Sequence, residues 1–244
     1  MASPLELEPI AARGWPAERQ SALGGWRLFA SAGFSGRINA CWPSGAADRP
    51  VEAAIEAVEA WYAAQGLPPK FKLAGDAFDP PDLADRLAAR GYAPTKPTLN
   101  MVGALGGEPD PQVAIAGEPG ADFRSVFADA AFGASGDAAE RLAALGRIPA
   151  PRGFALLSVD GAPAAVGACV TDGDLAGVIG MRTAPAYRRQ GLARRIFRAL
   201  TAFAHGQGAR RGYLQVEEGN GAAVALYRAE GFETAYIYQY WSKP

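Results

Sequence analysis

The sequence predicts an α+β fold, in which a mixed and mostly antiparallel sheet is flanked by helices. Two observations predict this class. In the second half of the chain, short apolar segments are joined by turns such as Asp160-Gly161, which is typical of antiparallel hairpins. After the apolar segment Leu175–Thr183, apolar residues recur with the spacing of one helix face, so a buried strand is followed by a helix. The first half of the chain repeats this order of elements.

In the first half, the pattern predicts a short strand at Leu5–Ile10 and a helix at Trp15–Leu23. A hairpin follows, with Gly33 and Gly36 in its connection. The hairpin strands and the later elements are expected at Gly25–Ala30, Gly36–Trp42, Pro50–Gln65 (a helix), Phe71–Leu73, Asp82–Arg90 (a helix) and Leu99–Val102.

The segment Gly103–Pro111 is rich in glycine and proline and predicts a linker. After it, strands are expected at Gln112–Ala116, Phe154–Val159, Ala164–Thr171, Leu175–Thr183, Gly212–Glu217 and Glu233–Tyr240. Helices are expected at Pro119–Phe132, Asp137–Leu145, Ala193–His205 and Asn220–Glu230.

The turn after Leu175–Thr183 carries the first chemical signal. Pro185 cannot donate to a β-ladder, so the strand is expected to end there. Gly191 precedes a helix N-terminus, whose unpaired N–H groups and partial positive charge suit a phosphate. Four arginines lie at the same end: Arg188, Arg189, Arg194 and Arg195. Taken alone, the turn fits an ordinary strand-to-helix connection with solvated arginines better than a phosphate site.

The segment Asn220–Gly231 carries the second signal. Asn220 is a favourable helix N-cap, and Gly231 is a favourable residue just after a helix. Asn220 and Tyr227 are seven residues apart, so on a helix they point within about 20° of the same direction. Taken alone, Tyr227 fits a packing role as well as an acid.

The pattern Arg188-x-x-Gly191-x-Ala193, followed by Asn220-x-x-Ala223-x-x-Leu226-Tyr227-x-x-x-Gly231-Phe232, resembles the GCN5-related N-acetyltransferases (GNAT). The resemblance covers Gln112 to Pro244, and one departure is Thr183, where the family often has valine. It implies an enzyme that uses acetyl-CoA to acetylate a primary amine of a small molecule or peptide by direct attack. A non-catalytic acyl-CoA-binding sensor is the alternative, and Tyr227 favours the enzyme.

The resemblance also implies roles for individual residues. Main-chain groups of Gly180–Thr183 orient the thioester, and a backbone N–H there stabilises the oxyanion. Tyr227 is the catalytic acid that protonates the leaving thiolate. The expected cofactor-binding residues are Met181, Arg182, Thr183, Arg188, Arg189, Gln190, Gly191, Leu192, Ala193, Arg194, Asn220, Ala223 and Tyr227.

The general base stays open at this point. Glu217, at the end of an expected strand, is the second candidate catalytic residue, with Glu218 beside it. Asp172 and Asp174 fit a turn role, and a water chain serves equally well as the base. The closing aromatic residues fit packing of one sheet face better than an acceptor pocket: Tyr236, Tyr238, Tyr240 and Trp241.

The first half resembles a degenerate copy of the second. Leu87 stands four residues before Gly91, as Tyr227 stands four residues before Gly231, and no Arg-x-x-Gly-x-Ala turn precedes Val51. We therefore expect two tandem GNAT-like domains, residues 1–105 and 112–244, of which the first has lost the phosphate turn and the acid. An unrelated α/β cap is the alternative.

The composition limits the partners. The chain has 244 residues and a net charge of −1, which disfavours nucleic acid and anionic membranes as the main partner. No apolar run reaches bilayer length and the N-terminus is acidic, so a cytoplasmic protein is expected. Cys41 and Cys169 are isolated, so no metal site is expected. The oligomeric state stays open between monomer and homodimer.

Overall fold

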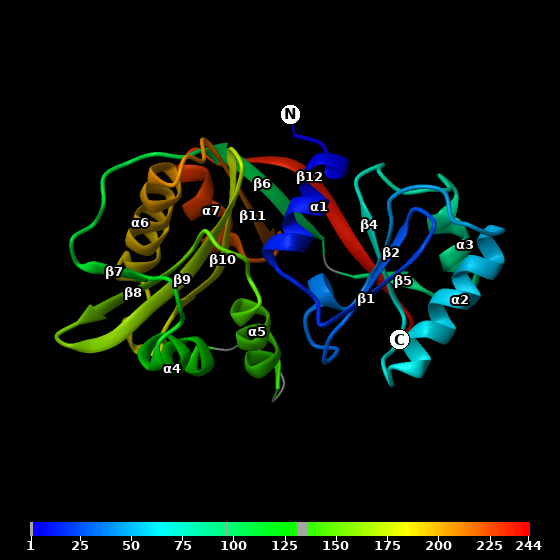
Figure 1. Cartoon of the computed structure of the whole chain (residues 1–244), viewed down its shortest axis with the longest axis horizontal. Helices are drawn as coiled ribbons and strands as arrows, with labels where there is room; N and C mark the ends of the chain where they lie inside the picture. Colours follow the sequence, from blue (N-terminus) through cyan, green and yellow to red (C-terminus); the bar gives the residue numbers. More distant parts are fainter. Residues whose placement is uncertain (1, 96, 131–135) are drawn as a thin grey trace. The chain divides into compact units, whose positions relative to one another are not determined.

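The computed structural model describes residues 2–95, 97–130 and 136–244 (Figure 1). Its internal contacts divide the chain into two units. Unit 1 contains Met1–Asn100, Val216–Gly221 and Thr234–Pro244, and unit 2 contains Met101–Gln215 and Ala222–Glu233. Each unit combines segments from both halves of the sequence, so the units differ from the two consecutive domains expected at residues 1–105 and 112–244.

Unit 1 is a sheet with helices. Its helices are α1 (Pro4–Gly14), η1 (Gly36–Ile38, a 3-10 helix), α2 (Val51–Ala64) and α3 (Leu83–Ala89). Its strands are β1 (Arg19–Leu23), β2 (Trp26–Ala30), β3 (Cys41–Pro43), β4 (Lys70–Ala74), β5 (Ala93–Pro94) and β12 (Glu233–Ser242). The strand order is β1-β2-β3-β4-β12, and β5 also pairs with β12. All these pairs are antiparallel except β3 and β4, which are parallel and are joined by α2.

The core of unit 1 lies between α2 and the sheet. Ile55, Val58 and Tyr62 follow the helical spacing of the sequence, and they are fully buried. They belong to one cluster with Trp26 and Phe71, whose rings meet edge to face with centroids 6.1 Å apart. The predicted helix at 50–65 is therefore confirmed, and its apolar face is the one that packs.

The first elements of unit 1 differ from the prediction. The expected strand Leu5–Ile10 lies within α1, because Ser3 caps a helix by accepting a hydrogen bond from the Glu6 N–H at 3.2 Å. The expected helix Trp15–Leu23 was also wrong, because it ends in β1, which forms a hairpin with β2 through a two-residue glycine turn. In both cases the apolar spacing was a weak signal. The Ser3 cap and the glycine turn determine the local structure instead.

The next hairpin is confirmed in part. β2 and β3 pair antiparallel as expected, from Trp26 opposite Pro43 to Leu28 opposite Cys41. The start of the expected strand Gly36–Trp42 is instead the 3-10 helix η1.

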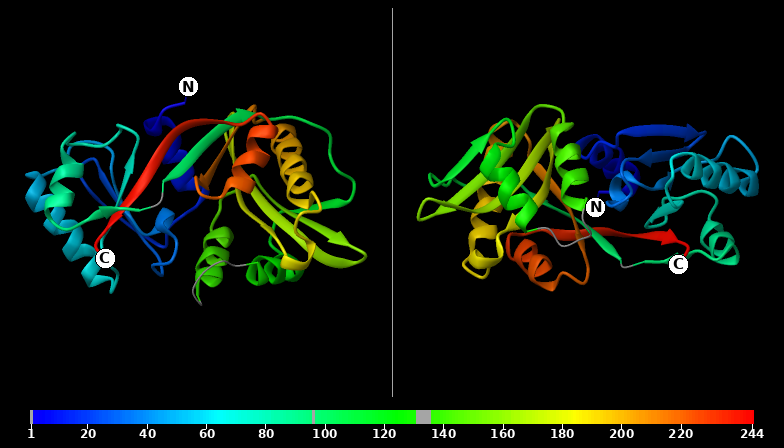
Figure 2. Two further views of the ribbon diagram at one scale, coloured as in Figure 1. Left: turned by 180° about the vertical axis from the view of Figure 1, so that it is seen from behind. Right: turned by 90° about the horizontal axis from the view of Figure 1, so that it is seen from below.

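Unit 2 is a sheet between two layers of helices (Figures 1 and 2). Its helices are α4 (Ala121–Asp129), α5 (Asp137–Gly146), η2 (Pro185–Tyr187), α6 (Leu192–Gly206) and α7 (Gly221–Ala229). Its strands are β6 (Thr98–Ala104), β7 (Val113–Ala116), β8 (Arg152–Val159), β9 (Ala162–Asp172), β10 (Leu175–Thr183) and β11 (Arg211–Glu217). The order is β6-β11-β10-β9-β8-β7, in which β7 to β10 are antiparallel and β10 pairs parallel with β11.

The predicted elements of unit 2 are confirmed except at one helix end. α4 ends at Asp129, whereas the sequence predicts a helix over 119–132, and Ala131 and Phe132 lie outside the described residues. The predicted hairpin turn has Asp160 and Gly161 at φ values of 50° and 81°, as a tight turn between twisted strands requires.

The last strand of each half of the sequence belongs to the unit built mainly from the other half. β6 follows α3 in the chain, yet its residues 101–104 belong to unit 2, where β6 neighbours β11. β12 follows α7, yet it pairs with β4 of unit 1 from Tyr238 opposite Ala74 to Ser242 opposite Lys70. The predicted linker Gly103–Pro111 thus begins inside β6, and its Leu105 N–H donates to the Arg210 carbonyl at 2.9 Å.

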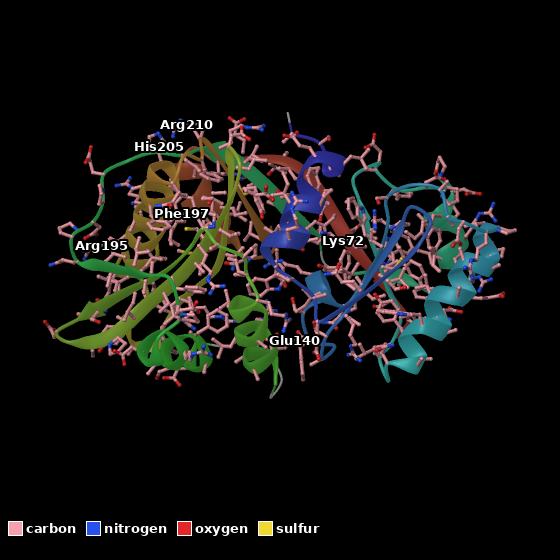
Figure 3. All side chains as sticks on the ribbon, viewed as in Figure 1. Lys72, Glu140, Arg195, Phe197, His205 and Arg210 are labelled. Carbon is pink, nitrogen blue, oxygen red and sulfur yellow. The ribbon has the colours of Figure 1, made fainter. Side chains whose placement is uncertain are left out.

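A buried polar network holds β12 in unit 1. The Glu8 carboxylate of α1 pairs with the Lys72 ammonium of β4, and the side chains of both are less than 10% exposed. The Tyr236 hydroxyl donates to Glu8 at 2.8 Å and accepts from the Asn100 amide at 2.5 Å. The Lys72 ammonium also lies 4.0 Å from the centroid of the Tyr238 ring (Figure 3). Burial, and then the charge of Glu8, raises the pKa of Tyr236. These closing tyrosines therefore pack inside unit 1.

Gly167 on β9 allows α6 to pack closely on the sheet. A Cβ at this position would lie 2.5 Å from the Met181 sulfur and 2.8 Å from a methyl carbon of Ile196. We expect Gly167→Val to lower the free energy of unfolding by about 1–3 kcal/mol, since overpacking displaces neighbours. Urea denaturation measures this. Gly206→Val is the control, because Gly206 is the last residue of α6 and a Cβ there meets nothing within 4 Å. Equal stability of the two variants would contradict the prediction.

Candidate functional site

The candidate site lies where the parallel pairing of β10 with β11 ends. The two strands pair from Leu175 opposite Arg211 to Gly177 opposite Tyr213, and the parallel ladder ends there. A Cβ on Gly177 would lie 2.5 Å from the Tyr213 hydroxyl oxygen, so the glycine is needed for that ring to lie against β10. β10 itself continues to Thr183, and among the described residues no strand pairs with it on that side beyond Gly177. A ligand with amide groups could extend the sheet along this segment.

β10 is also irregular on its other side. Its register against β9 shifts between Ile179 and Arg182, and Gly180 has a φ of 63°, which marks a β-bulge. Met181 reaches the α6 side of the sheet, where its sulfur lies close to Gly167. A Cβ on Gly180 would lie 3.2 Å from the Phe127 ring of α4 and 3.7 Å from Leu145 of α5. The segment expected to bind pantetheine is therefore bulged and enclosed by helices on both faces.

The turn between β10 and α6 has the backbone shape of an anion site. β10 ends at Thr183 and η2 begins at Pro185, as the sequence predicts. Arg189 and Gly191 have φ values of 62° and 78°, and α6 begins at the next residue. Successive N–H groups in such a turn form a concavity that attracts anions, and the helix N-terminus adds to it. A Cβ on Gly191 would meet nothing within 4 Å, so this side of the turn is open.

Some arginines near the turn form ion pairs with carboxylates, and the others lie exposed on the turn itself. The Arg194 and Arg198 guanidiniums lie 3.1 Å and 2.7 Å from the two oxygens of Glu230, next to α7. Arg195 points away toward the chain before β7, and it donates to Asp110 at 2.7 Å and 2.9 Å (Figure 3). That hydrogen bond lowers the pKa of Asp110.

The remaining two arginines are exposed on the turn itself. Arg188 donates to the Thr183 carbonyl at 3.3 Å, and Arg189 follows it. The positive field of the turn therefore comes chiefly from these two residues and from the main chain, because the charge of Arg194 is offset by Glu230. Gln190 is exposed beside them, whereas Leu192 is buried and Ala193 is half-buried. The sequence alone did not reveal the carboxylate partners.

Tyr227 is held against α6. Its ring centroid lies 5.2 Å from that of Phe197, which also contacts the Phe232 ring at 5.1 Å (Figure 3). α7 ends as predicted: Gly231 has a φ of 82°, and the Phe232 N–H donates to the Tyr227 carbonyl at 2.9 Å. Ala223 lies half-buried on the same helix. The second motif thus anchors α7 to α6, the helix that begins after the turn at Gly191.

Glu217 and Asn220 are exposed at the end of β11 and just before α7. The Asn220 N–H donates to the Glu217 carbonyl at 2.9 Å. Both belong to the residues 216–221 that are grouped with unit 1, so their roles beside Tyr227 stay predictions. Asp174 has a structural partner, because its carboxylate lies 3.1 Å from the Arg211 guanidinium.

The helix of unit 1 that the sequence predicts as the counterpart of α6 carries a carboxylate in its first turn. α2 begins after Pro50 and carries Glu52, which pairs with Arg86 and Arg90 near α3 at 2.9 Å and 2.7 Å. A carboxylate in the first turn disfavours a phosphate at the helix N-terminus, although Arg86 and Arg90 offset part of the charge of Glu52. This difference supports the expectation that the first half has lost the phosphate turn, which stays a prediction.

The two cysteines and the described acidic residues and histidine do not form a further reactive or metal site. Burial raises the pKa of Cys41 and raises that of Cys169 to about 12, so both thiols are poor nucleophiles. Within the described ranges, His, Cys, Asp and Glu do not gather in groups of three that could hold a metal ion. None of the described helices is both long and apolar enough to cross a membrane.

Comparison with known proteins gives consistent matches along the chain. Residues 5–241 match a family profile described as "Probable histone acetyltransferase Rv0428c C-terminal". The chain is 28% identical over 235 residues to the "Uncharacterized N-acetyltransferase YobR" of Bacillus subtilis (strain 168), covering 93% of each chain.

Solved structures share the fold. A GCN5-related N-acetyltransferase from Kribbella flavida aligns with a TM-score of 0.70 and 22% identity, covering 100% of this chain and 96% of that one. A tandem GNAT protein from the clavulanic acid biosynthesis pathway aligns with a TM-score of 0.60 and 15% identity, covering 99% and 88%. The mixed sheet with flanking helices is common to these proteins.

Proposed function

Because the chain belongs to the acetyltransferase family of the Rv0428c C-terminal profile and is an N-acetyltransferase of the GNAT type, we propose that it transfers the acetyl group of acetyl-CoA to a primary amine of a small molecule or peptide. One observation carries the proposal. The β10–β11 ladder ends at Gly177, and the part of β10 beyond it, which no described strand pairs on that side, leads directly into the positive-φ turn at the start of α6.

The residues of unit 2 fit such a cofactor. Main-chain groups of Gly180–Thr183 would pair with the amides of the pantetheine arm, as an added strand pairs with a sheet edge. The N–H groups of Arg189–Ala193 in this turn would hold the pyrophosphate, since the side of Gly191 is open. Arg188 and Arg189 add positive charge at the same place.

The chemistry requires one proton donor and one proton acceptor. Bound acetyl-CoA supplies the thioester, so the amine nitrogen bonds to the acetyl carbon while the carbon–sulfur bond breaks. Tyr227 donates the hydroxyl proton that the departing sulfur takes up. Glu217 or a water chain accepts the proton that the amine nitrogen loses. Packing on Phe197 orients the tyrosine for this step.

Two measurements test the proposal. Thermal unfolding with acetyl-CoA at 100 times its dissociation constant should show about 2.7 kcal/mol of added stability. Release of free thiol is then assayed with a panel of primary amines that includes polyamines, amino acids and lysine peptides. Cofactor binding without thiol release for any amine would favour the sensor alternative, and no stabilisation by acetyl-CoA would refute the proposal.

Tyr227→Phe tests the acid directly. We expect kcat to fall about 100-fold or more, because general acid catalysis typically contributes that much. The affinity for acetyl-CoA should stay the same, since the ring that packs on Phe197 is retained. Tyr92→Phe is the control, because it also loses a tyrosine hydroxyl, which donates to Glu59 within unit 1. An unchanged kcat in Tyr227→Phe would assign the proton to another group.

A further inference from the structure

Arg182 of β10 makes contacts that its expected main-chain role does not explain. Its side chain is largely enclosed, with 10% of its surface exposed. One nitrogen donates to the Ala130 carbonyl at 2.9 Å, and another lies 3.8 Å from the Asp137 carboxylate. The guanidinium carbon lies 4.6 Å from the centroid of the Phe127 ring. The Arg182 side chain therefore contacts three places: a ring on α4, the main chain just after α4, and the first residue of α5.

These contacts join the ends of two helices. Ala130 is the residue after α4, where helix carbonyls lack intrahelical partners. Asp137 is the first residue of α5, where a carboxylate is favoured by the helix dipole. Arg141 also donates to Asp137, at 2.7 Å, so two guanidiniums share this carboxylate. α4 and α5 pack on each other as well. Arg182 thus ties the pair of helices to β10.

Placing a guanidinium here costs stability. Burial, followed by the charge of Arg141, lowers the pKa of Arg182 to about 10, and Asp137 only partly opposes this. Apolar residues of similar volume would often replace a buried charged group at no loss of stability. An apolar side chain could not donate the hydrogen bond to the Ala130 carbonyl. The guanidinium therefore contributes to the placement of the helices rather than to stability.

The position matters because of the neighbouring residues. Phe127 and Leu145 cover Gly180, two residues before Arg182, on the face of β10 opposite Met181 and α6. The proposed acetyl donor is held by the main chain of β10 and by the α6 turn, and the described contacts of the Arg182 side chain reach neither. The contacts of this side chain affect where α4 and α5 lie beside the segment of β10 that would hold the thioester.

We infer that Arg182 is a positioning residue for the acetyl acceptor: it fixes α4 and α5 against β10, and so sets reactivity toward the amine without setting affinity for acetyl-CoA. The inference rests on the proposed function. It assigns the side chain of Arg182 to the acceptor side, whereas the family resemblance places the residue among the cofactor contacts.

The test uses Arg182→Met and Arg182→Lys in the full chain. Methionine fills a similar volume without donors, and lysine restores one donor to Ala130. Arg124→Met is the matched control, because Arg124 is an arginine of α4 that donates to a main-chain carbonyl, that of Pro119 at 2.9 Å. Three quantities are measured: acetyl-CoA affinity by calorimetry, kcat and KM for the fastest amine of the panel, and amide hydrogen exchange of residues 137–146.

We expect kcat/KM for the amine to fall about 100-fold in Arg182→Met, the effect of a misplacement of roughly 1 Å at a reacting centre. The acetyl-CoA affinity should be unchanged, exchange in residues 137–146 should be faster, and Arg182→Lys should recover part of the loss. Equal losses for amine and acetyl-CoA, or amine kinetics like those of Arg124→Met, would overturn the inference. Unchanged exchange in Arg182→Met would also overturn it, even if no amine were acetylated.

Failure of the proposed function gives a different result. In that case the wild-type chain itself is not stabilised by acetyl-CoA and releases no thiol with any amine. The exchange measurement compares Arg182→Met with wild type and does not depend on either reagent.

Discussion

A chain that ends after Glu233 is expected to lose the folded state of unit 1, although most of unit 1 lies before residue 101. Without β12, β4 has no partner from Lys70 to Ala74 on that side. The core also loses Tyr238, which is 1% exposed, and Trp241, which packs against the main cluster. Domains are stable by only about 5–15 kcal/mol, so the loss of a core strand exceeds what unit 1 can tolerate.

Amide hydrogen exchange in residues 51–74 measures this result. A chain that ends after Ser242 is the control, because it keeps β12 and loses only Lys243, which pairs with Glu59, and Pro244. Exposed pairs of this kind contribute about 1 kcal/mol or less. Native-like protection of α2 and β4 in the chain that ends after Glu233 would show that unit 1 folds without the strand.

Glu8→Gln separates the polar network from the strand itself. The change leaves the Lys72 ammonium buried without its carboxylate, which typically costs about 3–5 kcal/mol. We expect a large drop in the urea midpoint, with β12 still paired. Glu6→Gln, two residues earlier at an exposed position of the same helix, is the matched control. Equal midpoints for the two variants would mean that the network does not stabilise unit 1.

Gly191→Val is expected to weaken acetyl-CoA binding by about 100-fold, because a side chain would fill the space through which a phosphate reaches the N-terminus of α6. The variant should fold, since a Cβ at Gly191 meets nothing within 4 Å. Its φ of 78° adds some backbone strain for a β-branched residue. Calorimetry with acetyl-CoA measures the change in affinity.

Gly208→Val controls for that strain. Gly208 follows the other end of α6, has a φ of 102° and is also open, so the substitution strains the backbone far from the turn. We expect it to lower the free energy of unfolding and to leave the affinity unchanged. If both variants bound acetyl-CoA like the wild type, the turn would not be the phosphate site.

The sequence predicted a helix or turn correctly where its formation depends on residues that are close together in the chain. The apolar spacing of Ile55, Val58 and Tyr62 predicted α2 and its buried face. The pair Asp160-Gly161 predicted a hairpin, and Gly231 predicted the end of α7. The prediction failed at residues 5–23, because alternation over six residues was weaker evidence than the Ser3 cap and the glycine turn before Trp26.

The motifs likewise predicted the turn at Gly191 but not the partners of its arginines. Glu230 lies 36 residues after Arg194, and Asp110 lies 85 residues before Arg195. Each neutralises an arginine that the sequence predicts near a bound phosphate. Nothing in the local pattern of Arg182 indicated that its side chain would contact Ala130 and Asp137. Such contacts depend on which helices pack beside a strand.

The sequence by itself determined the α+β class, nearly every element of unit 2, the turn that begins α6 and the helix that carries Tyr227. Only the tertiary structure decided that β6 and β12 each complete the sheet of the other half's unit, and that Arg182 serves the helices rather than the turn. The physical reason is the range of the interactions. Caps, turns and apolar periods act within a few residues, whereas strand pairing and buried charge pairing join residues that the fold alone brings together.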